Sequence, residues 1–180
     1  TVHIAAYSHL LDTIGMPESE YGAFLEYSEL KDKHDYLQKF GVDNDEDIAR
    51  IARTMKVIAV VGLSPNEARP SWGVARYLQA NGFRIIPVNP GHAGSRILGE
   101  TVYASLSDIP RSAGVQMVDI FRRAEAVDPI VDEALRHLPD LRSIWLQLGI
   151  RNDGAAARAR ARGITVIQDR CPKIEFPRHL

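Results

Sequence analysis

The sequence predicts an α/β protein in which helices cover both faces of a parallel sheet of about five strands, with a helical segment before it. Short β-branched runs recur from Val57 to the C-terminal region. Segments with helical spacing separate these runs, and strands joined by such helices form right-handed crossovers in a parallel sheet. Most runs lack strict polar alternation, which is typical of strands buried on both faces.

Each element follows from its local pattern. The expected strands are 57–61, 84–88, 115–120, 143–147 and 164–167, and the expected helices are 71–81, 125–137 and 153–162. A glycine follows two of the helical stretches, at Gly82 and Gly163, as is common where a helix ends. The prediction is therefore a doubly wound, Rossmann-like sandwich. In such folds ligands bind beyond the carboxyl ends of the strands, where the strand order reverses.

The chain divides into two regions with different sequence patterns. Residues 1–43 are helical in period and contain almost no β-branched runs, whereas the strand pattern begins at Val57. We therefore expect a helical N-terminal appendage over 1–43, with amphipathic helices at about 2–13 and 18–40, and one α/β domain over 44–180.

Composition excludes several classes of protein. The chain has 180 residues, 45% hydrophobic and 25% charged, and a formal net charge of −1, so no overall field favours nucleic acid. The single cysteine, Cys171, excludes an internal disulfide and favours a reducing compartment. No apolar run reaches the roughly 18 residues that span a bilayer, and the N-terminus does not resemble a signal peptide. We expect a cytoplasmic protein without a membrane partner.

The loop after the first expected strand is the candidate phosphate site. It runs from Gly62 to Gly73 and lacks the G-x-G-x-x-G pattern of many dinucleotide-binding proteins. Ser64, Arg69 and Ser71 can supply hydroxyl, amide and guanidinium donors to a pyrophosphate. We expect Ser71 to cap the following helix and Gly73 to permit close approach of backbone or ligand.

The end of the second strand distinguishes between nucleotides. NAD sites usually place an Asp or Glu there, but this chain has Val88, Asn89 and Pro90. A neutral end tolerates a phosphorylated ribose, whose phosphate Arg96 or Arg122 could neutralise. The alternative is that the prolines at this position only shape a turn.

Six ordered blocks of the sequence resemble the small bacterial and archaeal CoA-binding protein family. The blocks span about 135 residues and are 58–64, 69–78, 87–90, 118–122, 145–149 and 169–175. The family is similar to the CoA-binding domain of the succinyl-CoA synthetase α subunit. Because the phosphohistidine machinery of that synthetase lies in a further domain, thiokinase activity does not follow.

The resemblance implies coenzyme A as the cofactor and a site along the carboxyl ends of the strands. It implies that the pyrophosphate lies around Gly62, Ser64, Arg69 and Ser71, and the adenosine near Val88, Asn89 and Pro90. It also implies that the pantetheine arm passes Phe121, Arg122, Gln147 and Gly149. Small homo-oligomers are common in such a family, so a homo-oligomer is a further expectation.

The N-terminal segment resembles something else, a fragment of the small, diiron subunit of class I ribonucleotide reductase. The stretches 1–9, 14–18 and 32–36 carry this resemblance, which places His3 at an iron-ligand position. A diiron carboxylate site needs ligands from four helices, and this segment supplies at most one of them. We expect no diiron centre here, and the six histidines of the chain lack zinc-site spacing.

Cys171 keeps a second class of function open. It follows the last strand, at the same edge as the proposed pantetheine path, where it could form a mixed disulfide with CoA. The alternative is a half-buried thiol in a Cys-Pro turn. We therefore expect a CoA or acyl-CoA binding module without catalytic residues of its own. The alternatives are a CoA-dependent thiol or acyl transferase or redox sensor that uses Cys171, and an NAD(P)-linked oxidoreductase.

Overall fold

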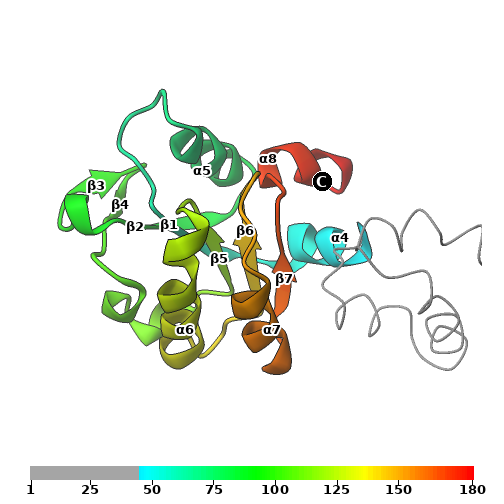
Figure 1. Ribbon diagram of the computed structural model, residues 1–180. Helices are drawn as coiled ribbons and strands as arrows, with labels where there is room; N and C mark the ends of the chain where they lie inside the picture. The colour runs from blue at the N-terminus through cyan, green and yellow to red at the C-terminus, as the bar shows by residue number, and fades with distance from the viewer. Residues whose placement is uncertain (1–44) are drawn as a thin grey trace, which may run out of the picture. The chain divides into compact units, whose positions relative to one another are not determined.

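The computed structural model describes residues 45–180, which form one compact unit from Asp45 to Leu180. The expected appendage over 1–43 lies outside the described residues. Figure 1 shows the unit as a central sheet with helices on both sides. In this part of the chain, no helix combines the length and the apolar character needed to cross a membrane.

A five-stranded parallel sheet forms the centre of the domain, as the sequence predicts. Its strands are β1 (Val57–Val61), β2 (Arg84–Val88), β5 (Met117–Ile120), β6 (Ser143–Leu146) and β7 (Thr165–Ile167). They lie in the order β2-β1-β5-β6-β7, and every neighbouring pair is parallel. The order reverses between β1 and β5, so the doubly wound prediction is confirmed and its switch point is located.

Helices cover the two faces of the sheet unequally. One face carries α6 (Val127–His137) and α7 (Asp153–Ala161), and the other carries α4 (Asp45–Thr54), α5 (Pro70–Ala80) and α8 (Pro172–Glu175). Alternate residues of each strand enter the two apolar cores, which explains the absence of polar alternation in the strand sequences. In the core on the α5 side, Trp145 and Phe176 meet edge to face with ring centroids 5.5 Å apart.

Several elements were not expected. Besides α4 and α8, they include a hairpin of β3 (Arg96–Ile97) and β4 (Glu100–Thr101). Residues 45–180 also contain five short 3-10 helices, at Pro90–His92, Leu106–Asp108, Arg111–Ala113, Ala124–Ala126 and Phe176–Arg178. The expected helix at 125–137 is thus a 3-10 turn followed by α6. The strand expected at 115–120 begins only at Met117.

Candidate functional site

The candidate site lies where β1 and β5 end side by side. β1 leads to α5 on one face of the sheet, and β5 leads to α6 on the other (Figure 1). The two connections therefore diverge at this edge, which is where parallel α/β sheets bind ligands. The backbone N–H of Phe121 donates to the carbonyl of Val61, 2.8 Å away, and extends the pairing to the edge itself.

Gly62 allows the two connections to touch. Its φ is +85°, and a Cβ placed on it would lie 2.4 Å from the carbonyl oxygen of Phe121. The same Cβ would lie 3.3 Å from Cδ of Arg122, so the Arg122 side chain extends over this turn. No other residue fits the position, because both its backbone conformation and the space around it exclude a side chain. Gly62 and Arg122, which the sequence assigned to different parts of the ligand, are therefore neighbours.

The turn between β1 and α5 is held by its own side chains. Ser71 Oγ accepts the backbone N–H of Ser64 at 3.1 Å, and Ser64 Oγ accepts that of Asn66 at 3.1 Å. Both serines thus shape the loop, while their hydroxyl hydrogens are available for a further acceptor. Ser71 is buried at the first turn of α5.

The expectation that Ser71 caps α5 is wrong. The cap residue is Arg69, in an extended conformation, and Pro70 is the first helical residue. Proline suits that position because it lacks the N–H that would have no helical partner, and it holds the preceding residue out of the helix. The Arg-Pro pair was the available signal. Gly73 lies inside α5, and a Cβ there would meet no atom within 4 Å. Protein packing therefore does not account for that glycine.

Arg69 and Arg122 are exposed cations at this edge. Within residues 45–180, neither of them makes a hydrogen bond or an ion pair through its side chain, whereas Arg84, Arg158 and Arg178 each pair with a carboxylate. An anion would therefore find these two guanidinium groups without competing carboxylates. The local positive charge coexists with a net charge near zero for the chain.

The end of β2 contributes Asn89. Its Nδ2 donates to the carbonyl of Leu63 at 3.0 Å, and its Oδ1 accepts the N–H of Gly91 at 3.0 Å. The side chain thus ties the β2 edge to the β1–α5 loop. Val88 is 2% exposed and its carbonyl accepts the N–H of Gly62, so it supports the loop from within the core. Asn89 and Pro90 are the candidates at this position that reach the surface.

Asp119 is a carboxyl group fully buried beneath the edge. Gln147 Nε2 donates to its Oδ1 at 2.5 Å, and no group within residues 45–180 hydrogen-bonds to its Oδ2. Burial raises the pKa of Asp119 to about 7, against the lowering effect of the Gln147 hydrogen bond. The pair also fixes the side chain of Gln147 at the end of β6.

The loops after β6 and β7 are joined through Asp169. Its Oδ1 accepts the N–H of Gly149 at 2.6 Å, and both residues have positive φ, +55° and +78°. The loop after β6 is therefore held against the loop after β7. Gly149 is brought to the same edge as Gln147, as expected.

Cys171 is the cap residue directly before α8 and is 9% exposed. Burial raises the pKa of its thiol, although hydrogen bonds from the backbone of Lys173 and Ile174 act in the opposite direction. A thiol with a raised pKa is protonated at neutral pH and is a weak nucleophile. The burial agrees with the alternative of a thiol in a Cys-Pro turn.

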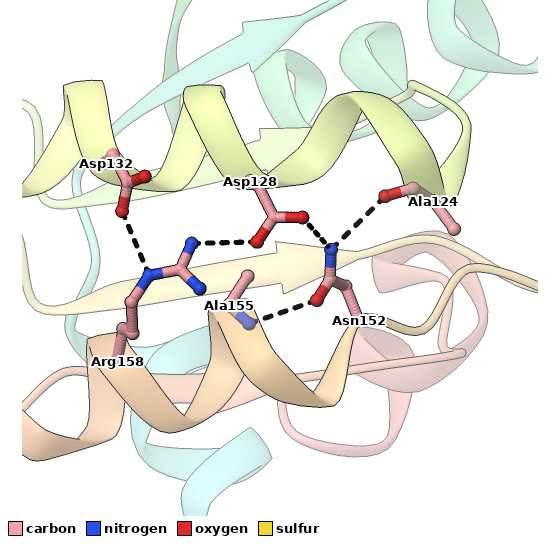
Figure 2. Close-up of polar contacts among 6 residues, drawn as sticks. All are labelled: Ala124, Asp128, Asp132, Asn152, Ala155 and Arg158. Atoms are coloured by element: carbon pink, nitrogen blue, oxygen red, sulfur yellow. Dashed lines mark hydrogen bonds and ion pairs between the residues drawn. The ribbon is translucent and has the colours of Figure 1, made fainter.

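A polar network on the other face joins α6 to α7. Figure 2 shows Arg158 between Asp128 and Asp132, and Asn152 between Ala124 and Asp128. Asn152 was not among the expected site residues. The signal for it was an Asn placed directly before a helical Asp-Gly-Ala-Ala stretch, a common N-cap pattern. Among residues 45–180, no group of three or more His, Cys, Asp or Glu side chains could hold a metal ion.

Strand order and edge residues together define a Rossmann-like α/β domain. Residues 56–177 match the family described as CoA binding domain, and the chain belongs to that family. It is 36% identical over 128 residues to YneT, an uncharacterized protein of Bacillus subtilis, covering 71% of this chain and 90% of YneT.

Solved structures agree with this assignment. A Thermus thermophilus protein is 34% identical with a TM-score of 0.70, covering 77% of this chain and all of the other. A hypothetical protein from Pyrococcus horikoshii is 32% identical with a TM-score of 0.69, covering 76% and 92%. A dinucleotide-forming acetyl-coenzyme A synthetase from Ca. Korarchaeum cryptofilum is 20% identical with a TM-score of 0.54, covering 66% of this chain and 27% of the synthetase, and it shows the fold alone.

A short stretch matches a different protein. Over 39 residues the chain is 64% identical to a ribonucleoside-diphosphate reductase small subunit of invertebrate iridescent virus 6. The match covers 22% of this chain and 11% of the viral protein. It agrees with the predicted resemblance to a fragment of that subunit.

Proposed function

We propose that this domain binds coenzyme A or an acyl-CoA at the edge where β1 and β5 end, and that it acts as a binding module rather than as an enzyme. In this proposal the pyrophosphate lies at the β1–α5 turn and the adenosine beside Asn89 and Pro90. The pantetheine arm passes Phe121, Gln147 and Gly149. The observation that carries the proposal is the contact of Gly62 with Phe121, which joins the two connections at the switch point beneath the Arg122 side chain.

The β1–α5 turn suits a diphosphate. Arg69 and Arg122 supply two guanidinium groups without ion pairs in the described part of the chain, and Ser64 and Ser71 supply hydroxyl donors. Hydrogen bonds between a guanidinium and a phosphate are among the strongest available to a protein. Gly62 supports this use of the turn indirectly, because the missing side chain lets the turn pack against Phe121 and brings Arg122 beside it.

The end of β2 weighs against NAD as the ligand. A carboxylate would be needed there to accept hydrogen bonds from the adenosine ribose, and the position holds Asn89. The amide of Asn89 is already engaged with Leu63 and Gly91. A ribose that carries a phosphate avoids repulsion at such a neutral end, and this favours CoA over NAD.

The burial of Cys171 weighs against thiol chemistry. Its raised pKa lowers the thiolate fraction at neutral pH, and an enzyme that used it would have to expose the sulfur first. A thiol or acyl transferase therefore stays the second candidate. Cys171→Ser tests it, because loss of a measured turnover would support chemistry, whereas unchanged CoA binding with no turnover to lose would support the binding module.

Isothermal titration with CoA, NAD and NADP under reducing conditions tests the ligand. We expect CoA to bind, and Arg69→Ala to weaken it by about tenfold, the effect of losing one charge-assisted hydrogen bond. Arg142→Ala is the matched control, since Arg142 is an exposed arginine directly before β6, at the opposite edge of the sheet. Binding of NAD or NADP without CoA would overturn the proposal. An equal loss in both arginine variants would overturn the role of the turn.

A further inference from the structure

Asn152 joins the two connections that the pantetheine arm is proposed to follow. It stands at the end of the β6–α7 loop as the cap residue of α7. Its Nδ2 donates to the carbonyl of Ala124 at 3.3 Å and to Asp128 Oδ2 at 2.9 Å, so it reaches the start of the β5–α6 segment (Figure 2). One side chain thus links segments 28 residues apart in sequence.

The same residue is tied to the third connection at this edge. Its backbone N–H donates to Gln168 Oε1 at 2.8 Å, and Gln168 Nε2 donates to Asp153 Oδ1 at 3.1 Å. Gln168 directly follows β7. The loops after β5, β6 and β7 are therefore fastened to one another through Asn152 and its neighbours.

The spacing along the chain makes this link relevant to the site. Ala124 follows Phe121 by three residues, and Asn152 follows Gly149 by three residues. Each loop is thus fixed at its strand end by the sheet and, a few residues later, by Asn152. Resting on the CoA function proposed above, we propose that Asn152 is a positioning residue that fixes the distance between these loops for the pantetheine arm.

Arg158 is the comparison that distinguishes positioning of the loops by Asn152 from a general contact between α6 and α7. It pairs with Asp128 at 2.8 Å and with Asp132 at 3.1 Å, and so joins the bodies of α6 and α7. Among residues 45–180, its side chain makes no hydrogen bond with Ala124 or with the loop after β6. Loss of Arg158 removes two contacts between the helices, whereas loss of the Asn152 amide removes its bond to Asp128 on α6 and also the bond to the Ala124 carbonyl that joins the loops.

The test compares two ligands in three proteins. CoA and 3′-phospho-ADP, the same nucleotide without the pantetheine arm, are titrated into the wild type, Asn152→Ser and Arg158→Ala. In the wild type, the backbone N–H of Ala155 donates to Asn152 Oδ1 at 3.0 Å, and a serine hydroxyl can still accept this cap hydrogen bond. Serine has no amide donor and is too short to reach the loop after β5. The serine variant loses both hydrogen bonds that the Asn152 amide donates, and we expect it to weaken CoA about three- to tenfold and to leave 3′-phospho-ADP unchanged. Arg158→Ala should change neither.

The outcomes are distinct. Unchanged CoA affinity in Asn152→Ser, or an equal loss for both ligands, would overturn the positioning role while leaving the CoA function intact. If the wild type bound neither CoA nor 3′-phospho-ADP, the proposed function itself would fail. Should the serine variant misfold, Asn152→Asp keeps the cap acceptor and sets a negative charge against Asp128, and the same selective loss of CoA affinity is expected from it.

Discussion

The buried carboxyl of Asp119 should make the stability of this domain depend on pH in an unusual direction. Its pKa is raised from 3.8 to about 7 in the folded protein. A pKa that is higher in the folded state than in the unfolded state means that the folded state binds the proton more tightly. The stabilisation is therefore fully present below the unfolded pKa, and it is lost as the pH rises through about 7.

The size of the effect follows from the two pKa values. Each unit of difference corresponds to about 1.4 kcal/mol, so raising the pH from well below 3.8 to above 7 removes roughly 4 kcal/mol from the free energy of unfolding. Between pH 5 and pH 8 the loss is about 3 kcal/mol by the same relation. Most paired carboxylates act in the opposite direction. Asp128 is one, because its hydrogen bonds with Arg158 and Asn152 lower its pKa.

Asp119→Asn isolates the contribution of this one group. Asparagine can still accept the Gln147 hydrogen bond, but it cannot ionise, and the other titrating groups cancel when the two proteins are compared. Urea unfolding at several pH values from 5 to 8 should give a free energy of unfolding that falls for the wild type relative to the variant. A difference between the two proteins that stays constant, or that grows in favour of the wild type as pH rises, would refute the reasoning.

Four further substitutions test the packing and the space open to the ligand. Gly62→Ala should lower the free energy of unfolding by about 3 kcal/mol, since positive φ and the Phe121 carbonyl both oppose a Cβ; Gly82→Ala, with positive φ but open space, should cost only about 1 kcal/mol in the same urea titration. Gly73→Ala should stabilise α5 by about 0.5–1 kcal/mol and weaken CoA in calorimetry, and unchanged affinity would mean that the ligand stays clear of Gly73. Phe176→Ala should cost about 3–5 kcal/mol in thermal or urea unfolding, and a loss below about 1 kcal/mol would contradict its place in the core.

The central strands could be predicted because the signal lies within each segment. The strands at Val57–Val61 and Arg84–Val88 have the predicted bounds, since a run of β-branched residues buried on both faces needs no distant information. The fold class followed from their alternation with helices. The nearness of Gly62 to the β5 edge also follows from topology once the strand order reverses between β1 and β5.

Other features depend on contacts that no local pattern records. The β3–β4 hairpin turns at Leu98 and Gly99, and Leu98 has a φ of +51°, a conformation that a leucine gives no reason to expect. Ser71 is not the cap because Pro70 begins the helix and makes Arg69 the cap residue, a signal that the Arg-Pro pair carries in the sequence itself. Asn152 was visible as a helix cap, yet its bond to Ala124 depends on how α6 and α7 pack.

The polar groups at this edge are of two kinds, and the difference between them indicates which groups would select the ligand. One kind forms side-chain hydrogen bonds within the protein and so holds the loops in place before any ligand binds. These residues are Asn89, Gln147 and Asp169. The guanidinium groups of Arg69 and Arg122 make no hydrogen bond or ion pair within residues 45–180. A frame that is already in place loses little entropy when an anion binds. The two arginine side chains must still be ordered, and the charge-assisted hydrogen bonds that they gain should make affinity depend on the phosphates. Discrimination among ligands that share those phosphates should then fall to the spacing of the loops that Asn152 connects.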